Sequence, residues 1–209
     1  MAIGVAISPV PVIAVILMLF SNRAAANSLS FLAGWVGGLM VAGLIVLALE
    51  VEIGGDSDSG GVIKIVIGAL FVVLGVKQWM GRPHSGEEAT MPGWMATIDD
   101  FTAPKSFGLA FLLSAVNPKN LGLTIAAVST IGASNLETGE EIATLVVFVI
   151  LASLTVAVPV LLYLALGAKA EAQLTVMKDW LVANNNTVMA VLFVVLGAKV
   201  LGDGISLVA

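Results

Sequence analysis

Long apolar stretches separated by short polar segments run along the whole chain. Six of them are long enough to form membrane-spanning helices, since about 20 apolar residues cross a bilayer. These stretches are residues 2–20, 28–49, 61–80, 105–131, 142–166 and 187–207. The pattern predicts an all-α polytopic membrane protein with six transmembrane helices.

Four residues, Asn117-Pro118-Lys119-Asn120, interrupt the middle of the fourth stretch. Proline removes a hydrogen bond from a helix interior, and asparagine followed by proline is a good start for a new helix. A lysine near the bilayer midplane costs about 2.5–3.5 kcal/mol on insertion scales. We therefore expect this helix to stop and restart at the tetrad.

The first stretch carries a similar break near its start, Ser8-Pro9-Val10-Pro11. By the same argument Ser8 caps a helix that begins at Pro9. The fifth stretch contains Pro159 together with Ser153 and Thr155, so we expect a kink there, with hydroxyls bonding the freed backbone groups.

An internal repeat relates the two halves of the chain. The third stretch contains Phe71-Val72-Val73-Leu74-Gly75-Val76-Lys77, and the sixth contains Phe193-Val194-Val195-Leu196-Gly197-Ala198-Lys199. The first and fourth stretches match through their breaks. We expect three-helix repeats at 1–80 and 105–209, joined by a cytoplasmic linker at 81–104. Three spans are an odd number, so the second repeat must be inverted, as in secondary transporters with broken helices.

The linker contains apolar residues at helical spacing opposite two aspartates: Trp94, Met95, Ile98 and Phe101 against Asp99 and Asp100. This pattern predicts a short amphipathic helix at the membrane surface. Docking of a partner is the alternative interpretation.

Basic residues set the expected orientation, because they favour the cytoplasmic side. The loops after the first, third and fifth spans hold Arg23, Arg82, Lys105, Lys169 and Lys178. The loops after the second and fourth spans hold Asp56, Asp58, Glu137, Glu140 and Glu141. We expect a multi-pass protein of the cytoplasmic membrane with both termini extracytoplasmic. No basic residue precedes the first stretch, so we expect it to be retained rather than cleaved as a signal peptide.

Composition agrees with a membrane protein and narrows the chemistry. The chain is 59% hydrophobic and 11% charged, with a mean hydropathy of +1.07. There is no Cys, and His84 is the single His, so we expect no disulfide, metal site or cofactor. The net charge is −5 and the nine basic residues are scattered, so we expect no nucleic-acid partner.

Candidate binding chemistry is concentrated at the two breaks. Helix N-termini offer free N–H groups and a positive dipole end, and Lys119 adds a full charge. Because no span interior holds Asp or Glu, we expect an anionic guest. The predicted substrate-binding residues are Ser8, Pro9, Pro11, Asn117, Pro118, Lys119 and Asn120. The alternative is that Lys119 is structural and bonds carbonyls freed by Pro118.

Lys77 and Lys199 are accessory candidates, since both end the repeated motif. Each also has a simpler explanation. Lys77 lies near a span end and can extend to the interface. Lys199 precedes Asp203 by four residues, the spacing of a helical ion pair.

Several motifs together resemble one family of transport proteins. They are Ile7-Ser8-Pro9-Val10-Pro11, Gly34-Trp35, Pro92-Gly93-Trp94-Met95 and Asn117-Pro118-Lys119-Asn120-Leu121. The combination is similar to the GAP family, the peptidoglycolipid- or sulfolipid-addressing (Sap-type) proteins of the LysE exporter superfamily. The resemblance implies a six-span protein that moves glycolipids or their building blocks to the cell envelope.

The leading hypothesis is therefore an exporter of an anionic or amphiphilic envelope metabolite, with membrane lipids as its surroundings. A LysE-like amino-acid exporter is one alternative. A non-transporting assembly factor or a membrane-embedded acyl-transfer protein is another, but an enzyme needs a base, and no span holds a His, Asp or Glu for it apart from residues at span ends. Gly34 and Gly38 form a G-x-x-x-G pair, which favours packing within the chain over a homodimer seam.

Overall fold

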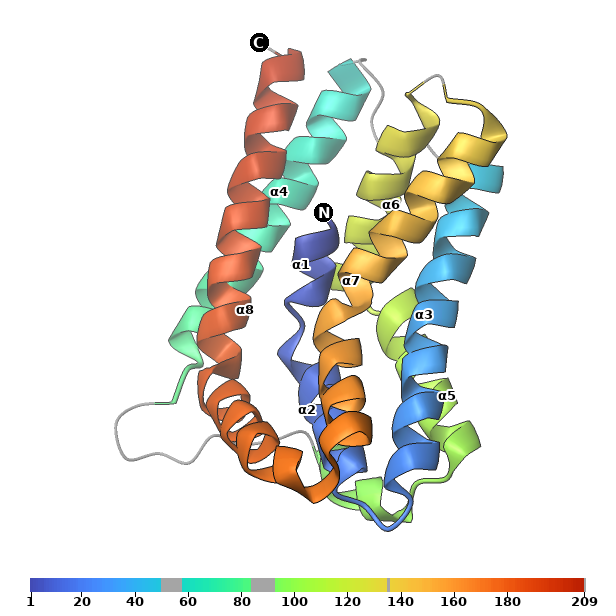
Figure 1. Ribbon diagram of the computed structural model, residues 1–209. Helices are drawn as coiled ribbons and strands as arrows, with labels where there is room; N and C mark the ends of the chain where they lie inside the picture. The colour runs from blue at the N-terminus through green and yellow to red at the C-terminus, as the bar shows by residue number, and fades with distance from the viewer. Residues whose placement is uncertain (50–57, 84–92, 135, 209) are drawn as a thin grey trace. The chain divides into compact units, whose positions relative to one another are not determined.

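The computed structural model describes residues 1–49, 58–83, 93–134 and 136–208, and these are helical with no strand among them. Figure 1 shows the helices. In chain order they are α1 Ala2–Ala6, α2 Pro9–Leu19, α3 Ala24–Ala48, α4 Asp58–Met80, η1 Gly93–Asp100, α5 Ala103–Ala115, α6 Pro118–Gly132, α7 Thr138–Leu166, η2 Gly167–Ala170 and α8 Glu171–Val208. The elements η1 and η2 are 3₁₀ helices. Asp56, His84 and Pro92, on which parts of the sequence analysis rest, lie outside the described residues.

Apolar helices of membrane-spanning length are present. Among the described residues, α3 and the helical stretch Thr138–Ser206 are long and apolar enough to cross a membrane. The pair α5 and α6 makes a third candidate if it is counted as one span bent by 59° at its break. The prediction of an all-helical fold is confirmed, its apolar helices indicate a membrane protein, and the number of six spans stays a prediction.

The chain divides into two compact units. Unit 1 consists of Met1–Glu50 and Thr90–Val182, and unit 2 consists of Val51–Ala89 and Ala183–Ala209. Unit 2 therefore holds α4 and the last part of α8, and unit 1 holds the other helices. The predicted repeats at 1–80 and 105–209 follow sequence similarity rather than contacts, and they stay a prediction.

In unit 1, α3 packs against α2, α5, α6 and α7. Phe31, Trp35 and Leu39 occur at every fourth position of α3 and are fully buried. This spacing places the three side chains along one face of the helix. That face supplies the largest side chains of the unit's core.

Two glycines bring α3 and α5 into close contact. An added Cβ at Gly34 would overlap the carbonyl of Phe107, and one at Gly38 would lie 2.9 Å from the carbonyl oxygen of Phe111. The prediction that this G-x-x-x-G pair packs within the chain is confirmed. Because both contact positions rise together along the sequence, α3 and α5 run parallel.

In unit 2, α4 and α8 also meet backbone to backbone. Small residues recur at every seventh position of both helices and form three contacts: Gly61 with Gly204, Gly68 with Gly197, and Gly75 with Ala190. An added Cβ would lie 2.8–3.1 Å from the carbonyl oxygen across each contact. Positions rise on one helix as they fall on the other, so the two helices are antiparallel. Phe71 and Phe193 pack beside this seam, with ring centroids 5.6 Å apart.

The short helix of the linker differs from its prediction. It is a 3₁₀ helix, η1, that contacts α2. Met95 and Ile98 are only 4% and 2% exposed, whereas Asp99 and Asp100 are exposed. The chain itself covers these two apolar side chains, and the predicted position at the membrane surface stays a prediction.

The last helix is longer than its predicted span. α8 begins at Glu171, whereas the sixth apolar stretch begins at residue 187. The intervening residues are a mixture of polar and apolar residues without Pro or Gly, so nothing in them breaks a helix. Its 38 residues correspond to about 57 Å of helix, well beyond the ~30 Å of a hydrocarbon core. Only part of α8 can therefore lie within a membrane.

Candidate functional site

Both predicted helix breaks are present in unit 1. α1 ends at Ala6 and α2 begins at Pro9, while α5 ends at Ala115 and α6 begins at Pro118 (Figure 1). Proline takes the first position of each restarted helix, where its missing N–H leaves no helical bond unmade. The two breaks therefore form where the prolines predict them.

The two residues before the prolines act differently. Asn117 caps α6, since its Oδ1 accepts a hydrogen bond from the backbone N–H of Lys119 at 3.1 Å. Ser8 has the extended backbone of a cap, but its hydroxyl donates to the carbonyl oxygen of Val5 at 2.8 Å. The prediction that Ser8 caps α2 through its side chain is wrong. Pro9 has no N–H for the Val5 carbonyl, so that oxygen is free to accept from Ser8.

Lys119 lies between the two breaks and is only 6% exposed. Its Nζ donates to the carbonyl oxygens of Gly4 at 3.0 Å and Ile7 at 2.8 Å, and to Ser8 Oγ at 2.6 Å. An ammonium has three N–H groups, so all of them have partners. Ile7 lacks its helical donor because Pro11 has no N–H. Lys119 thus closes the carbonyl end of α1, rather than bonding carbonyls freed by Pro118 as the alternative interpretation expects.

Asn120 joins the second break to the first. Its Oδ1 accepts from the Ser8 hydroxyl at 3.3 Å, and its Nδ2 donates to the carbonyl oxygen of Leu113 in α5 at 2.8 Å. Both Ser8 and Asn120 are buried. Ser8, Lys119 and Asn120, which are far apart in sequence, therefore meet in one network, and their role in binding stays a prediction.

Thr155 of α7 completes this network, although sequence analysis did not select it as a site residue. Its hydroxyl donates to the carbonyl oxygen of Ala6 at 2.6 Å, which also accepts from the backbone N–H of Ser8 at 2.8 Å. The hydroxyl was expected to bond its own helix, and it bonds α1 instead. The sequence feature that could have pointed to Thr155 is Pro159, four residues later in α7. Pro159 has no N–H to bond the Thr155 carbonyl, so the helical bonding is interrupted at Thr155.

The restarted helix α2 offers fewer donors than expected. Pro9 and Pro11 have no N–H, so only Val10 among the first three residues of α2 carries one. Both prolines are buried, whereas Pro118 is exposed and Asn117 is half-buried. The start of α2 therefore has few free N–H groups, Lys119 is the charged side chain beside it, and binding at these residues stays a prediction.

No carboxylate of the described residues pairs with Lys119. The ion pairs among those residues join Lys178 with Asp179 and Lys199 with Asp203. In the same ranges, no group of three His, Asp or Glu side chains is placed to hold a metal ion. Lys119 is therefore a buried cation whose known partners are all neutral oxygens.

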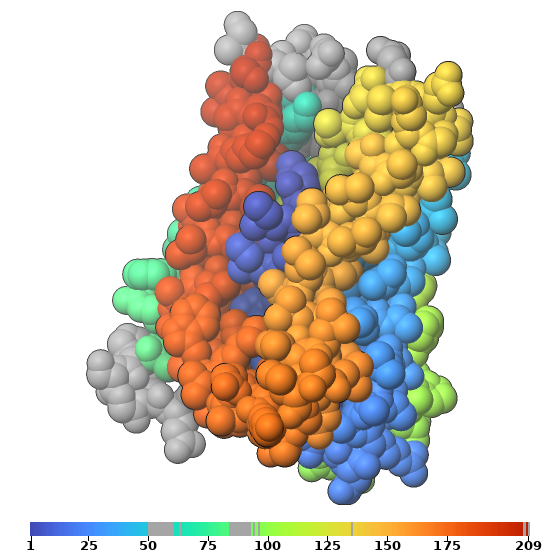
Figure 2. Space-filling view, viewed as in Figure 1, coloured from blue at the N-terminus to red at the C-terminus, as the bar shows by residue number. Residues whose placement is uncertain are grey.

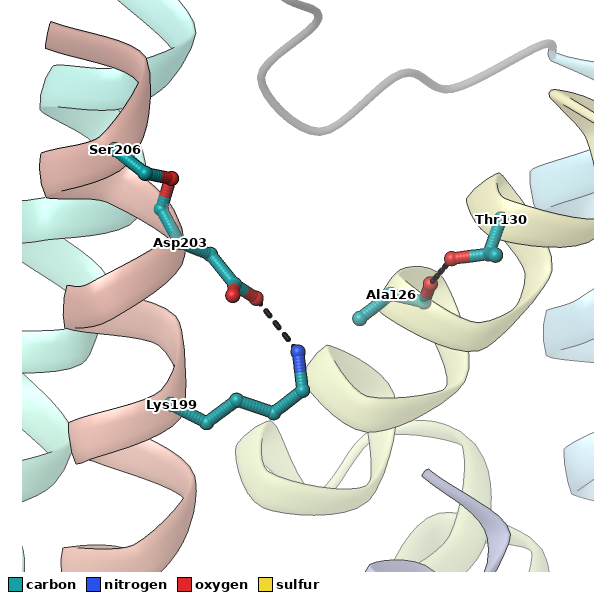
Figure 3. Close-up of polar contacts among 5 residues, drawn as sticks. All are labelled: Ala126, Thr130, Lys199, Asp203 and Ser206. Atoms are coloured by element: carbon teal, nitrogen blue, oxygen red, sulfur yellow. Dashed lines mark hydrogen bonds and ion pairs between the residues drawn. The ribbon is translucent and has the colours of Figure 1, made fainter.

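The two accessory candidates both belong to unit 2. Lys77 is exposed. Lys199 Nζ lies 2.6 Å from Asp203 Oδ2, with side chains 57% and 51% exposed, which is the predicted helical ion pair. Figure 3 shows this pair, together with the Thr130 hydroxyl that donates to the Ala126 carbonyl within α6. A binding role for either lysine stays a prediction.

The position of α1 also matters for access to the network. α1 contacts α6 and α7, and Figure 2 shows part of it, in dark blue, at the surface beside α7. Ile3 on α1 and Ile7 just after it are exposed, whereas Val5 and Ala6 are buried. The segment that accepts the bonds of Lys119 therefore has one exposed face.

Comparison with known proteins gives one match. The family model described as Sap, sulfolipid-1-addressing protein matches residues 1–206. No curated protein and no solved structure matches the chain. The match covers both helix breaks and both units.

Proposed function

The chain belongs to the Sap, sulfolipid-1-addressing protein family, and on that premise we propose that it exports an anionic or amphiphilic envelope metabolite across the cytoplasmic membrane. The family indicates a role in handling envelope lipids. The proposed cargo is a glycolipid or its acyl precursor, and the proposed mechanism is secondary transport without a catalytic step. Membership of the LysE superfamily is part of this proposal.

The observation that carries the proposal is the buried Lys119 ammonium at the junction of two helix breaks. Neutral oxygens do not balance the positive charge of a buried ammonium, and an anionic group can balance it. Broken helices at corresponding positions are where transporters of this type bind their substrates. Because Gly4 of α1 and the break residues Ile7 and Ser8 use all three donors of Lys119, the cargo would replace these oxygens, and this arrangement would be the closed state.

Six spans with an inverted repeat are supported by the directions of the helices. α3 and α5 run parallel, so a chain that crosses the membrane in α3 must cross back before α5 begins. α4 is the helix available for that crossing. We therefore propose that α1 with α2, α5 with α6, and the other long helices make six crossings.

The seam in unit 2 supports the inversion. The repeat aligns Gly75 with Gly197 and, at the same offset, Gly68 with Ala190. The contact of Gly68 with Gly197 then corresponds to the contact of Ala190 with Gly75, and both are observed. The repeat also aligns Phe71 with Phe193, so the contact between these two rings is its own counterpart when the repeats are exchanged. A two-fold axis in the membrane plane between α4 and α8 would produce this set of contacts.

A deletion strain tests the proposed export. Its envelope lipids and intracellular metabolites are compared with those of the parent, and then with those of strains that express wild type, Lys119→Met or Lys105→Met at equal level. Lys105→Met is the matched control, because it removes an exposed lysine outside the candidate site. We expect it to restore export, and Lys119→Met to lower export about tenfold or more, equivalent to ~1.4 kcal/mol in the rate-limiting barrier.

Other outcomes would change the proposal. Wild-type export by Lys119→Met would show that Lys119 has only a structural role. Accumulation of an amino acid in the deletion strain would favour the LysE-like alternative, and an unchanged set of transported compounds would favour an assembly factor. If Lys119→Met does not accumulate, Ser8→Ala tests the same network and Asn117→Ala tests the start of α6.

A further inference from the structure

Three oxygens surround the Lys119 ammonium, and we name them the oxygen cage: the carbonyl oxygens of Gly4 and Ile7 and the hydroxyl oxygen of Ser8. They lie 2.6–3.0 Å from Nζ. The Ser8 hydroxyl points its own proton at Val5 or Asn120, so its lone pairs remain available to a cation. The cage therefore presents only acceptors to its occupant.

The chemistry of the cage is that of a monovalent-cation site. Carbonyls at the end of a half-helix and at unwound backbone coordinate Na⁺ in many transporters. Divalent cations such as Ca²⁺ and Mg²⁺ prefer carboxylates, and the cage contains none. It lies at the C-terminal end of α1, the end at which helix dipoles favour positive charge.

We propose that the oxygen cage is a binding site for a monovalent cation, with the Lys119 ammonium as its tethered occupant. A free Na⁺ or K⁺ takes the cage when the ammonium leaves it. This inference rests on the proposed function only for the step in which Lys119 turns to an anionic cargo. Emptied of any cation, the cage would leave buried acceptors unsatisfied, which is costly away from water. A mobile cation in the cage would thus couple cargo binding to an ion.

The test removes the Lys119 ammonium and supplies free cations. Lys119→Ala is purified in detergent, and its melting temperature is measured in NaCl, KCl, NH₄Cl and choline chloride at equal ionic strength. Choline is too bulky for the cage and serves as the reference. We expect at least one small cation, at about ten times its Kd, to raise the melting temperature of Lys119→Ala by about 3–6 °C over choline. Wild type, whose cage is filled, should show no such preference.

Two further variants make the test specific. Lys105→Ala, which removes an exposed lysine outside the candidate site, should behave like wild type. Adding Ser8→Ala to Lys119→Ala removes one cage oxygen and should abolish the cation effect. An identical melting temperature of Lys119→Ala in all four salts would overturn the proposal, as would an effect that survives loss of Ser8.

The test stays informative if Lys119→Ala is unstable. Recovery of a monodisperse peak after extraction is then compared in the same salts, with Lys119→Met, which fills the space without a charge, as the folding control. Recovery of Lys119→Ala only in the salt of a small cation supports the proposed cation site. If Lys119→Met is recovered but Lys119→Ala is recovered in none of the salts, the proposal is overturned. Neither readout requires transport, so a cation effect combined with wild-type export by Lys119→Met would leave the cation site standing and reject the proposed role of Lys119 in cargo binding.

Discussion

Substitution of Gly197 by alanine measures how closely α4 and α8 approach. An added Cβ at Gly197 would lie 2.8 Å from the carbonyl oxygen of Gly68 and 2.8 Å from the backbone nitrogen of Val72. Both atoms belong to the backbone, so neither can rotate away as a side-chain end can. The two helices would have to separate by several tenths of an ångström along the seam.

The cost can be isolated with a matched control on the same helix. Nothing lies within 4 Å of an added Cβ at Gly202. Gly197→Ala and Gly202→Ala both gain the helix preference of Ala over Gly, about 0.5–1 kcal/mol, so this term cancels between them. The remaining difference is the steric clash, which in a well-packed interior is about 1–3 kcal/mol. At ~2–4 °C per kcal/mol, Gly197→Ala should melt about 2–12 °C below Gly202→Ala.

The assay is the melting temperature of each purified variant in detergent. Gly75→Ala, at the equivalent position of the repeat, should lose less stability than Gly197→Ala. Its added Cβ meets a side-chain methyl of Val194 at 2.7 Å and the Ala190 carbonyl oxygen at 3.1 Å, and the methyl can move. Equal melting temperatures for Gly197→Ala and Gly202→Ala would refute the backbone contact, and with it the support for an axis between the two helices.

Two further predictions concern α1 and the orientation of the chain. Thr155→Val removes the hydroxyl that bonds Ala6 and should lower the melting temperature, with a loss of stability of about 1 kcal/mol. Thr155→Ser keeps the hydroxyl and should match wild type. A Thr155→Val variant as stable as wild type would show that Thr155 does not belong to the network. Reporters fused after Ala209 and inserted at His84 should read extracytoplasmic and cytoplasmic, because basic residues favour the cytoplasmic side. Cytoplasmic activity at Ala209 would reverse the proposed orientation.

The helix breaks could be predicted because their causes are local. A proline has no N–H wherever the chain folds, and Asn before proline caps the next helix through a bond that spans two residues. Pro9, Pro118 and the cap at Asn117 follow these rules. The small residues Gly34 and Gly38 were similarly informative, since only a missing side chain allows backbones so close.

The partners of Lys119 could not be predicted, because they come from a distant part of the chain. Its three acceptors belong to residues 4, 7 and 8, and which carbonyls face a lysine depends on how helices pack. The Ser8 cap failed for a related reason. A cap oxygen accepts from the second or third N–H of its helix, but the third residue of α2 is Pro11, which has none, and the Ser8 oxygen accepts from Lys119 instead.

The cage also explains why this position holds lysine rather than the other strong cation. Its three acceptors lie 2.6–3.0 Å from a single nitrogen, an arrangement that suits the three N–H groups of an ammonium. A guanidinium spreads its donors over a plane and fits paired oxygens such as those of a carboxylate. Arginine would therefore keep the charge but leave part of the cage unsatisfied. Since a small spherical ion satisfies the same convergent oxygens, the features that select lysine here are those that would admit a free monovalent cation.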